Sequence, residues 1–169
     1  PFGPGGRLAE LGGGEHPIIR PNIDLRAMPT VDVVADVSLG IPLKDSSLDG
    51  LYAAYILEHM PTLKVRHFIA EVHRVLAPGG KAVLITANLE AQVKKFLEAQ
   101  EWNEGLLCMI FGGDPPYEGN FHRTGFSSWQ AHWLFKEAGF FEVKLMEHPA
   151  CVTDLIIEAH KSRAKVSLA

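Results

Sequence analysis

The chain has 169 residues, of which 47% are hydrophobic and 21% charged, and its formal net charge is −4 at pH 7 with histidine counted as neutral. Because folded domains cluster at about 100–200 residues, we expect a single domain over residues 1–169. The acidic balance and the lack of a basic stripe argue against nucleic acid as the main partner. No apolar run approaches the ~18 residues of a membrane-spanning helix.

The cysteines and histidines disfavour two further kinds of site. Cys108 and Cys151 lie far apart and lack C-x-x-C spacing, so we expect neither a disulfide framework nor a zinc site. The eight histidines are scattered along the chain, and we expect no metal. Since no secretory signal is visible, we expect a cytoplasmic chain. We further expect it to be a monomer or a homodimer.

Four short apolar segments in the first third of the chain predict four strands, at residues 7–11, 18–25, 31–37 and 51–57. The first segment runs into three consecutive glycines, Gly12 to Gly14, and the second ends in the acidic Asp24. Only nine residues separate Gly14 from Asp24. The first crossover helix is therefore expected to be short or absent.

The middle of the chain alternates between helical and strand patterns. Apolar residues at three- and four-residue spacing predict a helix over 65–76, which Pro78-Gly79-Gly80 ends. A buried strand over 82–86 and a helix over 89–100 follow. Residues 101–126 have weaker periodicity, and we interpret them as an insertion or lid with a short helix at its start.

The last forty residues complete the pattern. Ser127 is a suitable N-cap for a helix over 128–138, which Gly139 ends. Residues 140–147 and 152–160 alternate as a closing hairpin. Together the elements predict an α/β fold: a Rossmann-like three-layer sandwich with a mostly parallel seven-stranded sheet and a C-terminal antiparallel hairpin.

Glycines and acidic residues follow the predicted strands at their carboxyl ends, where ligands bind in open α/β sheets. Gly12, Gly13 and Gly14 let a ligand approach the backbone without interference from a Cβ, or they form a turn that needs positive φ. Asp24 can accept hydrogen bonds from both hydroxyls of a ribose, or it is a solvated carboxylate. Asp36, which ends the third strand, can bind an adenine amino edge together with the amide of Val37, or it caps a turn.

The fourth strand closes with a second group of candidates. Tyr55, Leu57, Glu58 and His59 end this strand, and Asn88 follows the fifth. Glu58 and His59 are interpreted as the start of a turn or helix, with His59 also a candidate base. We expect Asp49, just before the strand, to order the preceding loop.

A dinucleotide site fits these residues poorly. Such a site needs G-x-G-x-x-G opening a helix and an acidic residue about 20 positions later. Here Pro17 follows the glycines closely and Asp24 arrives within ten residues, so no helix N-terminus is available for a pyrophosphate. No G-x-x-x-x-G-K-[ST] loop is present, which argues against nucleotide triphosphate hydrolysis.

Three stretches resemble a known family: LAELGGGEHPIIRPNIDLR, ADVSLGIPLKDSSLDGLYAAYILEHM and FIAEVHRVLAPGGKAVLIT. They are similar to the class I S-adenosylmethionine (SAM)-dependent methyltransferases of the small type 11 kind. The resemblance extends from about Leu8 to His160. Two departures are Leu48, where the family usually has Phe before the Asp, and the truncated first crossover.

The resemblance implies a cofactor, SAM, and a role for each matching residue. The glycines Gly12, Gly13 and Gly14 would hold the methionine and ribose parts, with Glu10 behind them. Asp24 would bind the ribose hydroxyls. The remaining cofactor contacts would be Leu25 beside Asp24, Asp36 and Val37 at the adenine, and Tyr55 and Leu57 under the methionine portion.

The function that the resemblance implies is methyl transfer to an O or N atom of a small-molecule or glycan acceptor. His59 and His122 are the candidate catalytic bases, with His16 a further candidate, and Tyr117, Phe121 and Trp129 are candidates for the acceptor pocket. Two alternatives stay open: a non-catalytic interaction module with a degenerate form of the fold, and an oxidoreductase that uses a nucleotide cofactor.

Overall fold

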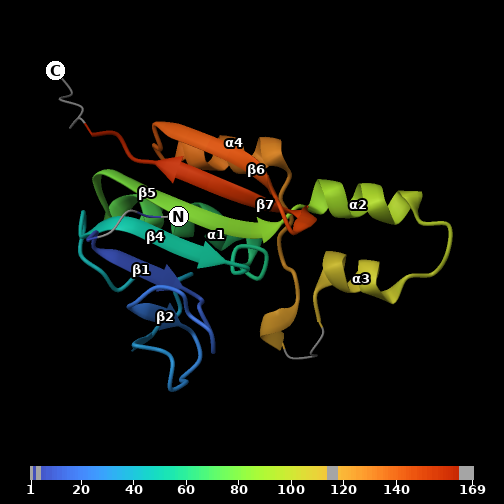
Figure 1. Cartoon of the computed structure of the whole chain (residues 1–169), viewed down its shortest axis with the longest axis horizontal. Coiled ribbons are helices and arrows are strands. Elements are labelled where there is room, and N and C mark those ends of the chain that lie inside the picture. The colour runs from blue at the N-terminus through green and yellow to red at the C-terminus, as the bar shows by residue number, and fades with distance from the viewer. Residues whose placement is uncertain (1, 3–4, 114–117, 164–169) are drawn as a thin grey trace.

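The computed structural model describes residues 2, 5–113 and 118–163, and these form one seven-stranded sheet with the strand order β3-β2-β1-β4-β5-β7-β6 (Figure 1). The neighbours from β3 to β5 run parallel, and β7 is antiparallel to both β5 and β6. The expected Rossmann-like sheet with a C-terminal antiparallel hairpin is confirmed. Its strands are β1 (Leu8–Leu11), β2 (Asn22–Asp24), β3 (Val33–Val34), β4 (Leu48–Ala54), β5 (Leu76–Ala87), β6 (Glu142–His148) and β7 (Cys151–His160).

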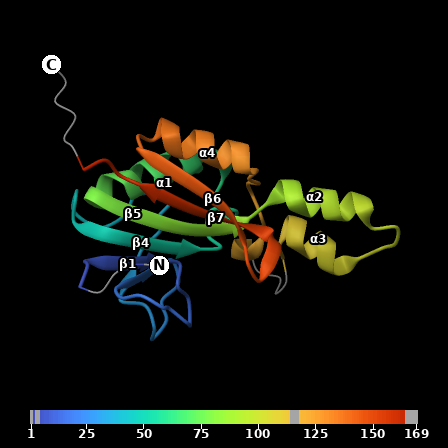
Figure 2. The same ribbon diagram turned by 45° about the horizontal axis from the view of Figure 1, so that its top comes forward.

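The helices fall into two groups. Helices α1 (Thr62–Val75) and α4 (Ser128–Glu137) contact each other and pack on one face of the sheet (Figure 2). Helices α2 (Leu89–Glu98) and α3 (Glu104–Phe111) pack together and project beyond the strand ends, with the short 3₁₀ helix η1 (Glu118–Asn120) after them. No helix of the described residues is long and apolar enough to cross a membrane.

The N-terminal half lacks crossover helices altogether. Residues 12–47, all of which the structure describes, contain no helix between β1 and β4. The expectation of a short or absent first crossover helix is therefore confirmed. This half of the sheet therefore supplies no helix of its own to cover its faces.

Three strand boundaries differ from those expected. The edge strand β3 is only two residues long and both are exposed, so Asp36 lies beyond its end. Strand β4 is displaced toward the N-terminus, so Tyr55 and Leu57 follow it instead of closing it. Asp49 lies inside β4, where its carboxylate accepts three hydrogen bonds from Arg7 and does not order the preceding loop. A buried glycine, Gly50, hid the start of this strand from an apolar pattern.

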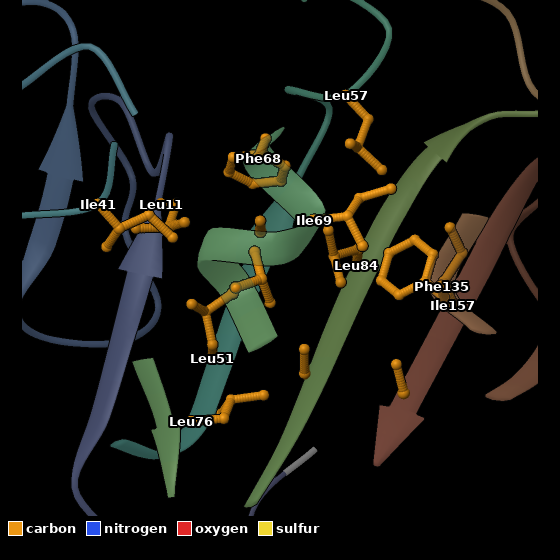
Figure 3. Close-up of a cluster of buried hydrophobic side chains, with 14 of the residues drawn as sticks. Leu11, Ile41, Leu51, Leu57, Phe68, Ile69, Leu76, Leu84, Phe135 and Ile157 are labelled. Carbon is orange, nitrogen blue, oxygen red and sulfur yellow. The ribbon is translucent and has the colours of Figure 1, made fainter. Parts of the chain in front are cut away.

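The hydrophobic core lies between α1, α4 and the covered face of the sheet (Figure 3). Phe68 and Ile69 of α1 point from the helix toward the strands, and Phe135 of α4 lies against the β5 and β7 end of the same cluster. All three side chains are fully buried, and the burial of each stabilises the fold by about 1.5–3 kcal/mol relative to an exposed position. The apolar spacing that predicted α1 is confirmed.

An ion-pair network fixes the connection into β4. Arg74 donates from Nε and Nη2 to the two carboxylate oxygens of Glu71 at 2.6 and 2.7 Å, and from Nη1 to Asp45 at 2.6 Å. The same guanidinium donates to the carbonyls of Ile41 and Leu43. The Arg74 hydrogen bonds hold the pKa of Glu71 at about 2.

This network gives the chain a pH-dependent stability. The pKa of Glu71 is lower in the folded chain than its ordinary value of 4.5, so its contribution is present above pH 4.5 and is lost as the pH falls toward 2. We expect Glu71→Gln to lose up to about 3 kcal/mol at pH 7 and little at pH 2. Urea unfolding of both chains at several pH values measures this difference, and a gap that stays constant with pH contradicts it.

Candidate cofactor and acceptor site

The glycine bend after β1 is shaped first by packing. Gly12 and Gly14 have φ of 73° and 55°, in the left-handed region that favours glycine. A Cβ at Gly12 would lie 2.2 Å from Ile56 Cγ2, and one at Gly13 would lie 2.7 Å from Asn22 Oδ1. A Cβ at Gly14 meets only the Arg26 side chain, at 3.2 Å. Packing therefore requires glycine at the first two positions, and Gly14 is the one whose surroundings can open toward a ligand.

Buried polar side chains support the loop that replaces the first crossover helix. Glu10 is 4% exposed, and its Oε2 accepts hydrogen bonds from the backbone amides of Ile18 and Ile19, both at 2.7 Å. Asn22 is fully buried, accepts from the Gly13 amide and donates to the Gly14 carbonyl. These bonds satisfy backbone groups that a helix would otherwise satisfy internally.

Asp24 meets the glycine bend directly. Its Oδ2 accepts from the Gly14 amide at 3.0 Å, and its Oδ1 accepts from the Arg26 amide at 2.8 Å. The guanidinium of Arg26 is half exposed and lies 3.6 Å from the same carboxylate. Each carboxylate oxygen retains a second lone pair. The residues therefore fit a ribose diol once the mobile end of the Arg26 side chain moves aside.

The next candidates continue along the same edge of the sheet. Leu25 is 65% exposed and offers an apolar surface beside Asp24. The Ala35 amide donates to the carbonyl of Asp24, the last residue of β2. Asp36, which follows Ala35, therefore lies close to the end of that strand. Asp36 Oδ1 accepts from the amide and hydroxyl of Ser38, so this carboxylate does cap its own turn. Val37 packs partly buried against the core.

Tyr55 and Leu57 take different positions. Tyr55 has φ of 54°, and its hydroxyl donates to Asp154 Oδ2 at 2.7 Å. Burial, and then the bond to Asp154, raise the pKa of this hydroxyl. Leu57 is fully buried in the hydrophobic core. Its side chain has no surface open to a ligand, so the expectation that it contacts a cofactor is wrong.

The two candidate bases come together. The imidazoles of His59 and His122 lie 5.1 Å apart between ring centroids. Nδ1 of His59 is 3.2 Å from the Phe121 carbonyl, and Nδ1 of His122 is 3.1 Å from the Ile110 carbonyl. A carbonyl oxygen can only accept, so each Nδ1 carries the proton and each Nε2 of the neutral ring has a free lone pair. Burial lowers the pKa of both rings.

Glu58, which the sequence analysis interpreted as the start of a turn or helix, also lines the site. It is 1% exposed, with Oε2 accepting from the Thr86 hydroxyl at 2.9 Å and Oε1 from the Ala87 amide at 3.3 Å. Burial raises the pKa of its carboxyl group. Its position next to His59 was visible in the sequence, but only the fold shows that the carboxyl is enclosed.

A cavity of about 300 Å³ lies where these groups meet, beyond the ends of β4 and β5. The segment after η1 helps to enclose it, because the amides of Arg123 and Thr124 donate to the Glu58 carbonyl at 2.7 and 3.1 Å. The chemically active residues among those that line the cavity are Tyr55, Glu58, His59, Cys108, His122 and Asp154.

The expected lid, residues 101–126, therefore supplies part of one wall, from α3 and from the return segment. The other residues expected near the acceptor have different outcomes, as follows. Trp129 is 72% exposed on α4 and does not line the cavity, so its expected role is wrong. Tyr117 lies outside the described residues, and Phe121 contributes its carbonyl to His59. His16 is exposed in the loop after the glycine bend.

The bend and the cavity are neighbours. Gly12 packs against Ile56, and the adjacent residue Tyr55 lines the cavity. The glycine bend and the cavity therefore lie close together at the same edge of the sheet.

Comparisons with known proteins agree with this arrangement. A family model described as a methyltransferase domain matches residues 20–84. The probable tRNA methyltransferase 9B of Mus musculus is 27% identical over an alignment of 127 residues, which covers 63% of this chain and 28% of that protein. This chain therefore spans less than a third of the length of that curated relative.

Solved structures share the fold. The CurJ carbon methyltransferase has a TM-score of 0.65 at 17% identity, covering 95% of this chain and 50% of that one. A SAM-dependent methyltransferase of Thermotoga maritima, described as a possible histamine N-methyltransferase, also has a TM-score of 0.65, at 18% identity, covering 95% of this chain and 84% of that one.

The sheet order and these matches resemble those of class I SAM-dependent methyltransferase domains. The cofactor that this likeness implies is SAM.

The fit of Asp24 to a ribose can be measured directly. We expect Asp24→Asn to weaken SAM binding about tenfold or more, which corresponds to about 1.4 kcal/mol, because the charged acceptor of the diol is lost. Asp32→Asn is the matched control, since Asp32 also accepts a backbone amide, from Asn22, but is exposed and makes no direct hydrogen bond to the three glycines. Isothermal titration calorimetry with SAM gives both values.

The Arg26 side chain supplies the converse test. Arg26→Ala removes the guanidinium that shares the Asp24 carboxylate and leaves the Arg26 amide in place. SAM affinity is expected to stay the same or to rise. A clear loss of affinity in this variant, or equal losses in Asp24→Asn and Asp32→Asn, contradicts the assignment of the ribose site.

Proposed function

We propose that the chain transfers a methyl group from SAM to an oxygen or nitrogen atom of a small-molecule or glycan acceptor. The single observation that supports it best is the pairing of the His59 and His122 rings, whose centroids lie 5.1 Å apart and which both line the cavity. The alternative of a non-catalytic module predicts a plugged cleft, whereas this cavity is lined by groups that can bind and deprotonate an acceptor.

When bound, SAM supplies an electrophilic methyl group on a sulfonium. The residues of this chain have the tasks of alignment and proton removal, of which alignment alone can lower a barrier by several kcal/mol. Gly14 and Asp24 hold the nucleoside end, and Tyr55, fixed by its bond to Asp154, lines the cavity. His59 or His122 then accepts at Nε2 the proton that the acceptor atom loses.

The size and charge of the cavity favour a small acceptor. A volume of about 300 Å³ is at the lower end of small-molecule pockets. The carboxyl groups of Glu58 and Asp154 line it, and the chain carries a formal net charge of −4. A phosphate backbone would meet no concentration of positive charge here, so the tRNA named for the mouse relative is the less favoured acceptor.

The proposal is tested in two stages, of which the first is a screen. Radiolabelled SAM is incubated with the chain and with hydroxyl- and amine-bearing small molecules, oligosaccharides and transfer RNA. Label should transfer to a compound of the first two kinds. Transfer to RNA alone contradicts the small acceptor, and failure to bind SAM at all excludes the proposed function.

The second stage uses variants of the histidine pair. With the acceptor identified, His59→Ala and His122→Ala should lower kcat, and removal of a general base costs about 10²–10⁴-fold. His132→Ala, at an exposed position on α4, is the control. The affinity for SAM should be unchanged in all three. Full activity in both cavity variants would show that neither ring serves as the base.

A further inference from the structure

Three side chains in the acceptor cavity form a second kind of site. The ligand atoms of Glu58, His59 and His122 all lie within 4.8 Å of one another. Glu58 and His59 come from the turn after β4, whereas His122 comes from the return segment more than sixty residues later. The fold therefore brings His122 to the adjacent pair of Glu58 and His59.

Both imidazoles are oriented as metal ligands are. A metal-bound histidine almost always donates its second ring N–H to a carbonyl or carboxylate, which fixes the tautomer and the direction of the free lone pair. Here Nδ1 of His59 is bonded to the Phe121 carbonyl and Nδ1 of His122 to the Ile110 carbonyl. Two rings held in the same way leave two Nε2 lone pairs available in one cavity.

The carboxylate lacks a cationic partner. Glu58 is almost fully buried, and its hydrogen bonds come from the neutral donors Thr86 and Ala87. In the described part of the chain no lysine or arginine pairs with it. A buried carboxylate is costly unless a cation or a proton compensates its charge. A bound cation would supply that charge.

We propose that Glu58, His59 and His122 bind one divalent transition-metal ion. Two imidazoles and a carboxylate suit Zn²⁺, Fe²⁺ or Co²⁺, whereas Mg²⁺ and Ca²⁺ prefer all-oxygen sites. Ligand atoms around a tetrahedral zinc lie about 3.4 Å apart, so the three groups, whose ligand atoms lie within 4.8 Å of one another, would have to draw closer to hold the ion.

This site shares His59 and His122 with the proposed function but does not depend on SAM, so a chain that binds no SAM would still bind the ion. With the ion bound the two rings would act as ligands and not as free bases. The fold thereby contradicts the basis of the sequence expectation of no metal, which rested on the scattered positions of the histidines.

The test is metal binding by the whole chain after treatment with a chelator. Zn²⁺ titrated into the protein should bind one to one with a Kd of about 1 μM or below, and Co²⁺ should give the visible absorption of a four- or five-coordinate site. His59→Ala and His122→Ala should each weaken Zn²⁺ binding by at least about tenfold. Their unfolding temperatures are measured alongside, so that a folding defect is recognised.

His132→Ala is again the matched control, since it removes an exposed histidine from α4. Its Zn²⁺ affinity should equal that of the unaltered chain. Equal loss in all three variants, a stoichiometry well above one, or Mg²⁺ binding as tight as Zn²⁺ overturns the proposal. So does unchanged Zn²⁺ affinity in the two cavity variants, which leaves the rings as acceptor-binding groups alone.

Discussion

The structure of the cofactor side depends on buried polar side chains that take the place of a missing helix. An ordinary crossover between β1 and β2 would satisfy its own backbone, but this one is too short for that. Glu10 and Asn22, both buried, bond the loop amides and carbonyls in its place. Without these bonds the backbone of the loop would be left unsatisfied, which costs about 1–3 kcal/mol for each group. The position of the glycine bend follows from this network.

The same network explains why glycine and acid residues are close in sequence here. Asp24 can bond the Gly14 amide because no helix stands between them, and the carboxylate has a structural task before any ligand arrives. Replacing such a residue would therefore disturb the loop as well as the proposed binding of a ribose. In the same loop Gly12 packs against Ile56, which places the glycine bend next to the cavity.

Much of the fold could be predicted from the sequence, because its signals are local. The apolar spacing of α1, the capping box of Ser127 and Gln130 and the alternation of the final hairpin all depend on neighbouring residues. The register of β4 could not be predicted, since Gly50 is buried without an apolar side chain to mark it. Leu57 was misassigned for a related reason, because an apolar residue beside a site looks the same in sequence whether it faces the ligand or the core.

The geometry of the candidate acceptor site could not be predicted from the sequence, because it depends on a contact between residues that are far apart in the chain. The carbonyl of Glu58 accepts both the Arg123 and the Thr124 amide, and this pairing brings the preceding residue, His122, to within reach of His59. Residue spacing carries no information about such a contact, so the histidines looked scattered. The backbone of Glu58 thus bonds the return segment while its side chain lines the cavity. The described parts of residues 101–126 therefore contribute groups to the candidate site as well as covering it.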